Sequence, residues 1–384
     1  MKILVISKCH THPTNQGNSA GILKQCTLFQ QLGHEVHFLY IDEQPLHKNP
    51  APWKEALRQT REWWGDKFHC FHVNKLDKLR ISGTKFFRLF FCNRRLGVDD
   101  NYPIGLTRRV EKLQRQHQFD VCVINYYELS RLFKHISIPK LAIFTHDIYA
   151  YKRLKTDTKM FDMTASAEAK AMQRCPHIFA VQDIEADYFQ VIAPHSKVYS
   201  IYGRFKHVAA PVAGNRNILF LSSDNQYNIH GIRWFVTEIL PQILKRWPDA
   251  KLLAGGMICK AVPELANTPG VECVGFVENP EEFYLRGDVA INPISKGTGL
   301  KIKTFDSMAR DKVTIVHPHS LEGVYRPDQI PVYASDKPEE WVKYLEKVWG
   351  SDQQVILDVK KRNHEYLKSM DEFVISEYKR FLAD

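Results

Sequence analysis

Short apolar runs that alternate with stretches of helical spacing constrain the fold of this chain more than any other feature. The first run, 2–7, leads into a turn-rich loop, 9–17, and then into a helical stretch, 20–32, that a glycine ends. Further apolar runs lie at 35–40, 121–124, 141–144 and 178–181. Strand, helix and strand in this order are typical of βαβ units, so the pattern predicts a parallel sheet.

A second series of the same kind begins after a polar, turn-rich stretch at about 203–215. Its apolar runs are 218–221, 251–254, 271–274, 289–291 and 313–316, with helical stretches at 229–246 and 300–309. A length of 384 residues also suits two domains better than one core. We therefore expect an α/β chain of two Rossmann-like, doubly wound parallel-sheet domains, 1–205 and 206–365, facing a central cleft. The helical pattern of 366–384 predicts a last helix that packs back on the first domain.

The loops after the predicted strands are where functional residues are expected. In doubly wound sheets, ligands bind beyond the carboxyl ends of the strands. The loops that meet this condition are 8–18, 145–150, 222–228 and 293–300.

Several classes of protein are disfavoured by what the sequence lacks. No stretch approaches the roughly 20 apolar residues of a membrane span, and the first residues lack the apolar length and cleavage site of a signal peptide. The eight cysteines lie far apart, without a C-x-x-C pair or a Cys/His cluster at zinc spacing. We expect a cytoplasmic protein with reduced thiols and no metal site.

The net charge of +10 is unevenly distributed. Residues 1–205 hold 30 Lys and Arg against 19 Asp and Glu, whereas the rest holds 23 against 24. Within the first half, 67–96 contains eight basic residues, one acid and six phenylalanines. This mixture suits an interfacial segment on anionic lipid, and a solvated loop packed by its own phenylalanines is the alternative. We expect peripheral contact with the inner face of a membrane, and no nucleic-acid partner, because no nucleic-acid-binding motif is evident.

The segment 288–306 carries the strongest chemical signal. It combines a buried strand, a loop closed by Gly297-Thr298-Gly299, and an amphipathic helix. Free backbone N–H groups before a helix favour an anion such as a diphosphate. Lys303 and Asp306, three residues apart, share one face of that helix and suit a pyrophosphate and a ribose. A surface Lys-Asp pair after an ordinary glycine turn is the alternative.

This segment resembles the donor-site signature of glycosyltransferase family 4 and related GT-B enzymes, roughly D-V-x-x-x-P-x-x-x-G-T-G-L-K-x-K-x-x-E-A-M-A. The matching residues are Asp288, Pro293, Gly297, Thr298, Gly299, Leu300, Lys301, Lys303, Met308 and Ala309. The likeness extends to 228–235, 240–243, 247–252 and 274–277. In the first half it is thinner, at Pro13, Gly17, 33–36, 145–147, Glu168 and 179–185.

The resemblance implies a GT-B hexosyltransferase that takes a nucleotide-diphosphate sugar as donor and needs no separate cofactor. The implied acceptor is a glycan or lipid-linked molecule of the cell-surface polysaccharide or lipopolysaccharide type, and the implied stereochemistry is retention. Catalytic roles are expected for His146, Lys303 and Asp306. Donor contacts are expected from Gly17, Arg204, Ser222, Ser223, Gly297, Thr298, Gly299, Leu300 and Lys301. Because lysines supply the cation and no Asp-x-Asp motif is present, we expect metal independence.

The chain also departs from the family pattern. Many members carry two glutamates eight residues apart, and these positions are Thr298 and Asp306 here. The loop 222–225 lacks the usual glycine and the basic residues of some relatives. Two alternatives therefore stay open: a sugar-nucleotide epimerase of the same fold, and a catalytically degenerate sugar-nucleotide-binding protein.

Overall fold

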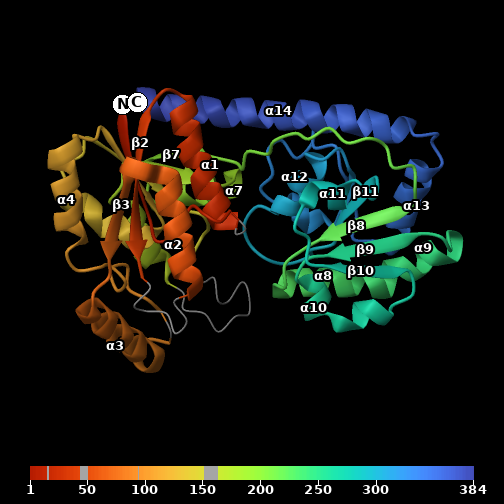
Figure 1. Ribbon diagram of the computed structural model, residues 1–384, viewed down its shortest axis with the longest axis horizontal. Helices are drawn as coiled ribbons and strands as arrows, with labels where there is room; N and C mark the ends of the chain where they lie inside the picture. Colours follow the sequence, from red (N-terminus) through yellow and green to blue (C-terminus); the bar gives the residue numbers. More distant parts are fainter. Residues whose placement is uncertain (15–16, 44–50, 94, 151–162) are drawn as a thin grey trace. The chain divides into compact units, whose positions relative to one another are not determined.

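The computed structural model describes residues 1–14, 17–43, 51–93, 95–150 and 163–384. These residues form two compact units, Met1–Tyr202 together with Ile375–Asp384, and Gly203–Val374. The division at 202/203 lies three residues before the 205/206 boundary expected from the sequence. The last ten residues group with the first unit, and the final helix, α14 (Gln354–Ala383), belongs partly to each (Figure 1).

The first unit is built on a seven-stranded sheet in the order β3-β2-β1-β4-β5-β6-β7, with every pairing parallel. Its strands are β1 (Lys2–Ser7), β2 (Glu35–Asp42), β3 (Phe68–His72), β4 (Val121–Asn125), β5 (Lys140–Phe144), β6 (His177–Ala180) and β7 (Lys197–Ser200). The central strands are continuous apolar runs because a parallel sheet is covered on both faces.

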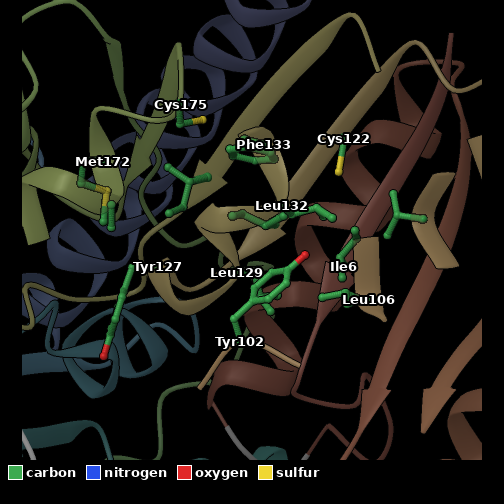
Figure 2. Close-up of a cluster of buried hydrophobic side chains, with 14 of the residues drawn as sticks. Ile6, Tyr102, Leu106, Cys122, Tyr127, Leu129, Leu132, Phe133, Met172 and Cys175 are labelled. Atoms are coloured by element: carbon green, nitrogen blue, oxygen red, sulfur yellow. The ribbon is translucent and has the colours of Figure 1, made fainter. Parts of the chain in front are cut away.

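Helices cover this sheet and close its core. They are α1 (Gly17–Gln31), α2 (Ala51–Trp64), α3 (Lys75–Phe91), α4 (Leu106–His117), α6 (Ala165–Met172) and α7 (Asp183–Ile192), with a 3-10 segment at Tyr127–Lys134. Figure 2 shows part of the core, in which Ile6 of β1 and Cys122 of β4 lie among Leu106, Leu129 and Leu132. All five side chains are fully buried.

The second unit contains a six-stranded sheet in the order β10-β9-β8-β11-β12-β13, again parallel. Its strands are β8 (Asn217–Leu221), β9 (Lys251–Gly255), β10 (Val271–Gly275), β11 (Val289–Asn292), β12 (Val313–Val316) and β13 (Tyr333–Ala334). Its helices are α8 (Gln226–Trp234), α9 (Leu240–Arg246), α10 (Ile258–Ala261), α11 (Pro280–Tyr284), α12 (Ile302–Met308) and α13 (Pro338–Trp349). Among the described helices, none combines the length and apolarity needed to cross a bilayer.

Both sheets share the doubly wound strand order in which the first strand lies between the second and the fourth. The order reverses between β1 and β4 in one unit and between β8 and β11 in the other. Ligands of such sheets bind at this switch point, beyond the carboxyl ends of the strands. The predicted fold class of two Rossmann-like parallel-sheet domains is thus confirmed, and the switch points direct attention to the loops after β8 and β11.

Some elements differ from those that the apolar pattern predicts. The apolar runs did not mark β3, β7 or β13 as strands. The helix expected over 229–246 is interrupted by a π-helical turn, Phe235–Ile239, just before Pro241. Proline has no N–H to donate within a helix and its ring crowds the preceding turn, so the wider turn accommodates it.

A buried carboxyl group at the start of α7 gives the first unit a specific pH dependence. Glu185 is 1% exposed, and burial together with the nearby Asp147 raises its pKa to about 8. The folded state therefore holds a proton between pH 4.5 and 8 that the unfolded state releases, so this contribution to stability is complete below pH 4.5 and lost as pH rises through 8.

We expect Glu185→Gln to remove that pH dependence. Relative to the variant, the wild type should lose a few kcal/mol of its free energy of unfolding between pH 5 and pH 8. Urea titrations of both proteins at the two pH values measure this difference. An equal difference at pH 5 and pH 8 would show that Glu185 ionises normally.

Candidate functional site

The loop after β8 is tied to the end of the neighbouring strand. Ser222 donates its N–H to the carbonyl of Gly255 at 2.9 Å, and its own carbonyl accepts from Ile258. Gly256 has φ 93°, and a Cβ there would lie 2.3 Å from the Ser222 oxygen, so only glycine fits. The next residues are capped by Asn225, whose Oδ1 accepts from the first N–H groups of α8.

The loop after β11 is shaped by glycines. Gly297 has φ 114° and Gly299 has φ 72°, backbone conformations that favour glycine. A Cβ on Gly231 of α8 would lie 2.8 Å from the carbonyl of Pro293, so this glycine lets the helix approach the loop. His319 fixes the far side of the loop through Nε2, 3.0 Å from the Gly297 carbonyl.

Lys303 joins the two loops through Asn228. The ammonium of Lys303 donates to Asn228 Oδ1 at 2.7 Å. The amide of Asn228, 2% exposed, donates in turn to the carbonyl and the hydroxyl of Ser223, both at 3.1 Å. These three side chains come from α12, α8 and the loop after β8, so they form one polar network at the β8–β11 switch point.

Burial makes the charge of Lys303 sensitive to its surroundings. Desolvation lowers the pKa of its ammonium to about 8, and the nearby Asp306 partly offsets this effect. Within the described residues, no carboxylate forms an ion pair with Lys303. A desolvated cation without a carboxylate partner is stabilised by an incoming anion, because the anion supplies the missing charge.

The other predicted donor residues have recorded partners of their own. Lys301 turns back onto its own loop, with Nζ 2.8 Å from the Gly299 carbonyl. Asp306, whose side chain is 43% exposed, lies 3.8 Å from Arg310. Arg204 forms a two-point ion pair with Asp371 of α14. Its charge is thus matched by a carboxylate of α14.

The helix after the glycine loop is shorter than expected. The sequence predicted it over 300–309, but α12 spans Ile302–Met308, and Lys301 precedes it with φ −83° and ψ 78°. Leu300 and Thr298 therefore lie in the loop itself, half-buried. The helix therefore begins at Ile302, one residue before Lys303 and its side-chain network.

His146 lies in the first unit, directly after β5, in a strained backbone. Its φ is 65°, and Tyr126, directly after β4, has φ 75°. The two rings stack with centroids 4.3 Å apart, and Phe144 lies 4.5 Å from the histidine on another side. Left-handed backbone at residues other than glycine is costly and clusters at functional sites.

The protonation of His146 follows from its partner. Asn125 donates its amide to the carbonyl of Ile6 at 3.3 Å, which leaves Oδ1 to accept from His146 Nε2 at 2.8 Å. Burial lowers the pKa of the imidazole to about 3. The ring is therefore neutral at physiological pH, with Nδ1 available to accept a hydrogen bond. Such a weak base suits hydroxyl recognition better than proton removal.

The loop that carries His146 is held by one buried carboxylate. Glu168 of α6, fully buried, accepts from the N–H groups of Tyr149 and Ala150 at 2.8 and 3.0 Å. It also accepts from the hydroxyl of Tyr188 at 2.8 Å. Gly17, the other site residue predicted in this unit, is the exposed first residue of α1, and 15–16 of its loop lie outside the described residues.

Sequence reasoning missed Asn228 as a site residue. It stands first in the N-x-x-G stretch that resembles the family pattern, three residues before Gly231. That spacing places both residues on the face of α8 turned to the glycine loop. The signal was available, but a buried asparagine is indistinguishable in sequence from a surface one.

Comparisons with known proteins found one matching family and one related sequence. The family described as Glycosyl transferases group 1 matches residues 215–351. A Klebsiella pneumoniae protein described as an uncharacterized 44.6 kDa protein in the cps region is 24% identical over 345 residues, 80% of each chain.

Solved structures share the fold over the whole chain. Anabaena HepE in complex with UDP aligns over 100% of both chains, with 12% identity and a TM-score of 0.64. A variant of S. aureus TarM in complex with fondaparinux, alpha-GlcNAc-glycerol and UDP aligns over 98% of this chain and 100% of its own, with 10% identity and a TM-score of 0.65. The matched range 215–351 contains the Ser223–Asn228–Lys303 network and both loops that surround it. Residues 215–351 are thus similar to the Glycosyl transferases group 1 family, and the chain as a whole has the two-domain GT-B fold of glycosyltransferases.

Proposed function

We propose that this glycosyltransferase moves a hexosyl group from a UDP-sugar to a glycan or lipid-linked acceptor of cell-surface polysaccharide type, with retention and without a metal ion. The observation that carries the donor assignment is the buried Lys303 ammonium, held by Asn228 beside Ser223 and the loop with Gly297 and Gly299. UDP is the nucleotide in the complexes of HepE and TarM. The cps region named for the Klebsiella relative supports a polysaccharide acceptor.

The chemistry required of the site is stabilisation of a leaving diphosphate. Negative charge grows on the leaving oxygen as the bond to the sugar breaks, and a preorganised cation in a dry site lowers that barrier. Lys303 supplies this cation, and Asn228 orients it. In this proposal the hydroxyl of Ser223 and the loop amides around Thr298 donate hydrogen bonds to phosphate oxygens. In this proposal Asp306 supports the charge of Lys303, because its carboxylate partly offsets the effect of burial on the pKa of the ammonium.

In this proposal His146 recognises a sugar hydroxyl at the carboxyl edge of the first unit's sheet. A neutral imidazole with a bare Nδ1 accepts a hydrogen bond from a sugar hydroxyl, and the Tyr126 ring behind it keeps its orientation. Because its pKa is about 3, His146 does not serve as the base. The acceptor proton then passes to the departing diphosphate oxygen, as retention on one face requires.

The experiment that tests the reaction follows a radiolabelled sugar. UDP-sugars are incubated with the protein and membranes of the source cells, and label is measured in the lipid and polysaccharide fractions. Transfer with equimolar UDP release supports the proposal, and proton NMR of the product reads retention. Conversion of the free UDP-sugar to its epimer would identify an epimerase, and binding without turnover would identify a degenerate protein. Loss of activity in chelator would overturn metal independence.

A helix with an exposed apolar stripe supports a membrane-bound acceptor. α3 buries little apart from Asp77 and Ile81. The opposite face carries large apolar side chains that are 52–73% exposed: Leu76, Leu79, Phe86, Phe87, Phe90 and Phe91. Phe86 contacts Phe90, and Phe87 contacts Phe91, with ring centroids 4.7 and 5.1 Å apart. The phenylalanines therefore pack on each other rather than on the protein core, and the segment is a helix where the alternative interpretation expected a loop.

The charges of α3 favour an anionic surface as the partner of this stripe. Lys75, Lys78 and Lys85 are exposed, and no ion pair is recorded for them within the described residues. Arg88 is neutralised by Asp100 at 2.8 Å and anchors the helix. An aromatic stripe flanked by free lysines suits an anionic bilayer surface. α3 begins beyond the carboxyl end of β3 (Figure 1), at the edge of the sheet where His146 also lies.

We expect the double substitution Phe86→Ser with Phe90→Ser to reduce binding to anionic vesicles at least fivefold. Each phenylalanine removed from the bilayer forfeits on the order of 2 kcal/mol of apolar burial. Flotation with vesicles of phosphatidylglycerol and phosphatidylcholine measures the bound fraction.

Phe276→Ser is the matched control, because Phe276 is 79% exposed but lies in the second unit. The control should bind as the wild type does. Unchanged flotation of the α3 variant, or failure of the wild type to bind at any salt concentration, would remove the membrane from the proposal.

A further inference from the structure

Three histidines from distant parts of the sequence meet at the amino edge of the first unit's sheet. His37 is the third residue of β2, His69 the second of β3, and His117 the last of α4. His69 is opposite Leu39 in the parallel pairing, so it shares a face of the sheet with Leu39 and His37. α4 packs on this face through Leu113, which belongs to the same core cluster as Leu39, and thereby brings His117 to the pair.

The geometry of the three rings suits one small ion. One nitrogen from each imidazole lies within 4.8 Å of the other two. His37 Nδ1 and His69 Nε2 are 3.0 Å apart, and the His117 ring centroid lies 4.7 and 5.1 Å from those of His37 and His69. Two nitrogens on a tetrahedral zinc ion are about 3.4 Å apart for bonds of about 2.0–2.1 Å. A metal ion therefore fits once the His37 and His69 rings move slightly apart and the proton between them is lost.

A carboxylate prepares His37 for this role. His37 Nε2 donates to Glu35 Oε1 at 2.8 Å, which leaves the lone pair of Nδ1 directed at the other two rings. Metal-bound histidines commonly donate their second N–H to a carboxylate in this way. The His37 side chain is 5% exposed, whereas that of Glu35 is 41% exposed and reaches solvent.

Neutral imidazole is the form of histidine that ligates a metal ion. The charges that face the cluster are Glu35, with Lys2 and Lys67 near it, and Arg109.

We propose that His37, His69 and His117 bind one divalent transition-metal ion of the Zn²⁺ type, with Glu35 orienting His37 and solvent completing the coordination. Three imidazoles suit Zn²⁺, Ni²⁺ and Cu²⁺ but not Mg²⁺ or Ca²⁺, which prefer oxygen ligands. The sequence analysis expected no metal site, because the long separations between these histidines match no metal-binding motif. The fold alone assembles them.

The position of the site defines its role. It lies at the amino edge of the sheet, whereas His146 and the loops that bind ligands in doubly wound folds lie at the carboxyl edge. The ion therefore ties β2, β3 and α4 together and takes no part in sugar transfer. This inference is independent of the proposed function.

The test is equilibrium dialysis of untagged, chelator-treated protein against Zn²⁺, with thermal unfolding as a second measurement. We expect one tightly bound ion per chain and a rise in Tm on binding. His69→Ala should weaken binding at least a hundredfold and abolish the shift in Tm, and Glu35→Gln should weaken binding about tenfold. Both variants should refold to the wild-type circular dichroism spectrum without metal.

A second group of ligand types in the same unit provides the control. Asp42, Cys70 and His72 also lie within 4.8 Å of one another, near the carboxyl ends of β2 and β3. The double variant Cys70→Ser with His72→Ala should bind Zn²⁺ as the wild type does, and X-ray absorption should show nitrogen ligands at about 2.0 Å without sulfur at about 2.3 Å. Unchanged affinity in His69→Ala, a sulfur ligand, or no bound ion would each overturn the proposal.

Discussion

Lys303→Met should reduce kcat/KM for sugar transfer by about 10²–10³-fold, the usual loss when one preorganised electrostatic stabiliser is removed from a transition state. Methionine keeps the length of the side chain and removes the charge that Asn228 orients. The loss should fall on kcat as well as KM, because the diphosphate gains charge in the transition state. Initial rates across a range of UDP-sugar concentrations measure both quantities.

Lys312→Met is the matched control for this variant. Lys312 is fully buried in the second unit, and burial lowers its pKa to about 8, as it does for the half-buried Lys303. It lies directly before β12, at the amino edge of the sheet. Activity within about twofold of wild type is expected for the control. An equal loss in both variants would show that any buried lysine of this domain is needed for folding, and not Lys303 for chemistry.

The pKa of Lys303 adds a signature to the same experiment. Since the charged ammonium is the active form and its pKa is about 8, kcat/KM should fall as pH rises above 8. This fall in kcat/KM above pH 8 should persist in Lys312→Met. It should be missing in Lys303→Arg, because arginine stays charged over this range.

His146→Ala should reduce kcat/KM by about 10–100-fold, which corresponds to about 1.4–2.7 kcal/mol of lost transition-state binding. The variant removes the acceptor Nδ1 and the ring that stacks on Tyr126. Wild-type activity should show no acid limb between pH 5.5 and 7.5 that belongs to this residue, since its pKa is about 3. Steady-state kinetics over that range measure both effects.

His146→Asn separates recognition from folding, because an amide also offers an acceptor near this position. It should recover part of the activity lost in His146→Ala, with thermal stability of both variants close to wild type. An acid limb near pH 6 that disappears on substitution would instead identify His146 as a general base.

The fold was predictable because both sheets are built from buried parallel strands. Such strands appear as continuous apolar runs. In Ile3–Ile6 every residue is apolar and fully buried, and in Val313–Val316 only Thr314 is polar. β3 was missed for the opposite reason. Its sequence, FHCFH, is interrupted by two histidines and is only half-buried at the sheet edge. Edge strands carry a weaker signal because only part of their surface is covered.

The sequence indicated which loop carries the candidate site, but not the hydrogen-bond and ion-pair partners of its side chains. The glycines of the loop after β11 and Lys303 follow a fixed local pattern, so sequence alone identified them. The partners of charged side chains depend on which distant segments the fold brings together. Arg204 was expected at the diphosphate, but Asp371, 167 residues away, holds it. Asn228 was not expected, yet it is the residue that links Lys303 to Ser223.

The central claim is that Ser223, Asn228 and Lys303 form the binding site for a nucleoside diphosphate. Titration calorimetry with UDP on wild type, Lys303→Met and Lys312→Met tests it most directly. We predict one UDP per chain for wild type and Lys312→Met, in chelator as well as without it, and at least tenfold weaker binding for Lys303→Met. No binding of UDP, GDP or dTDP to the wild type, or equal affinity of Lys303→Met and wild type, would contradict the claim.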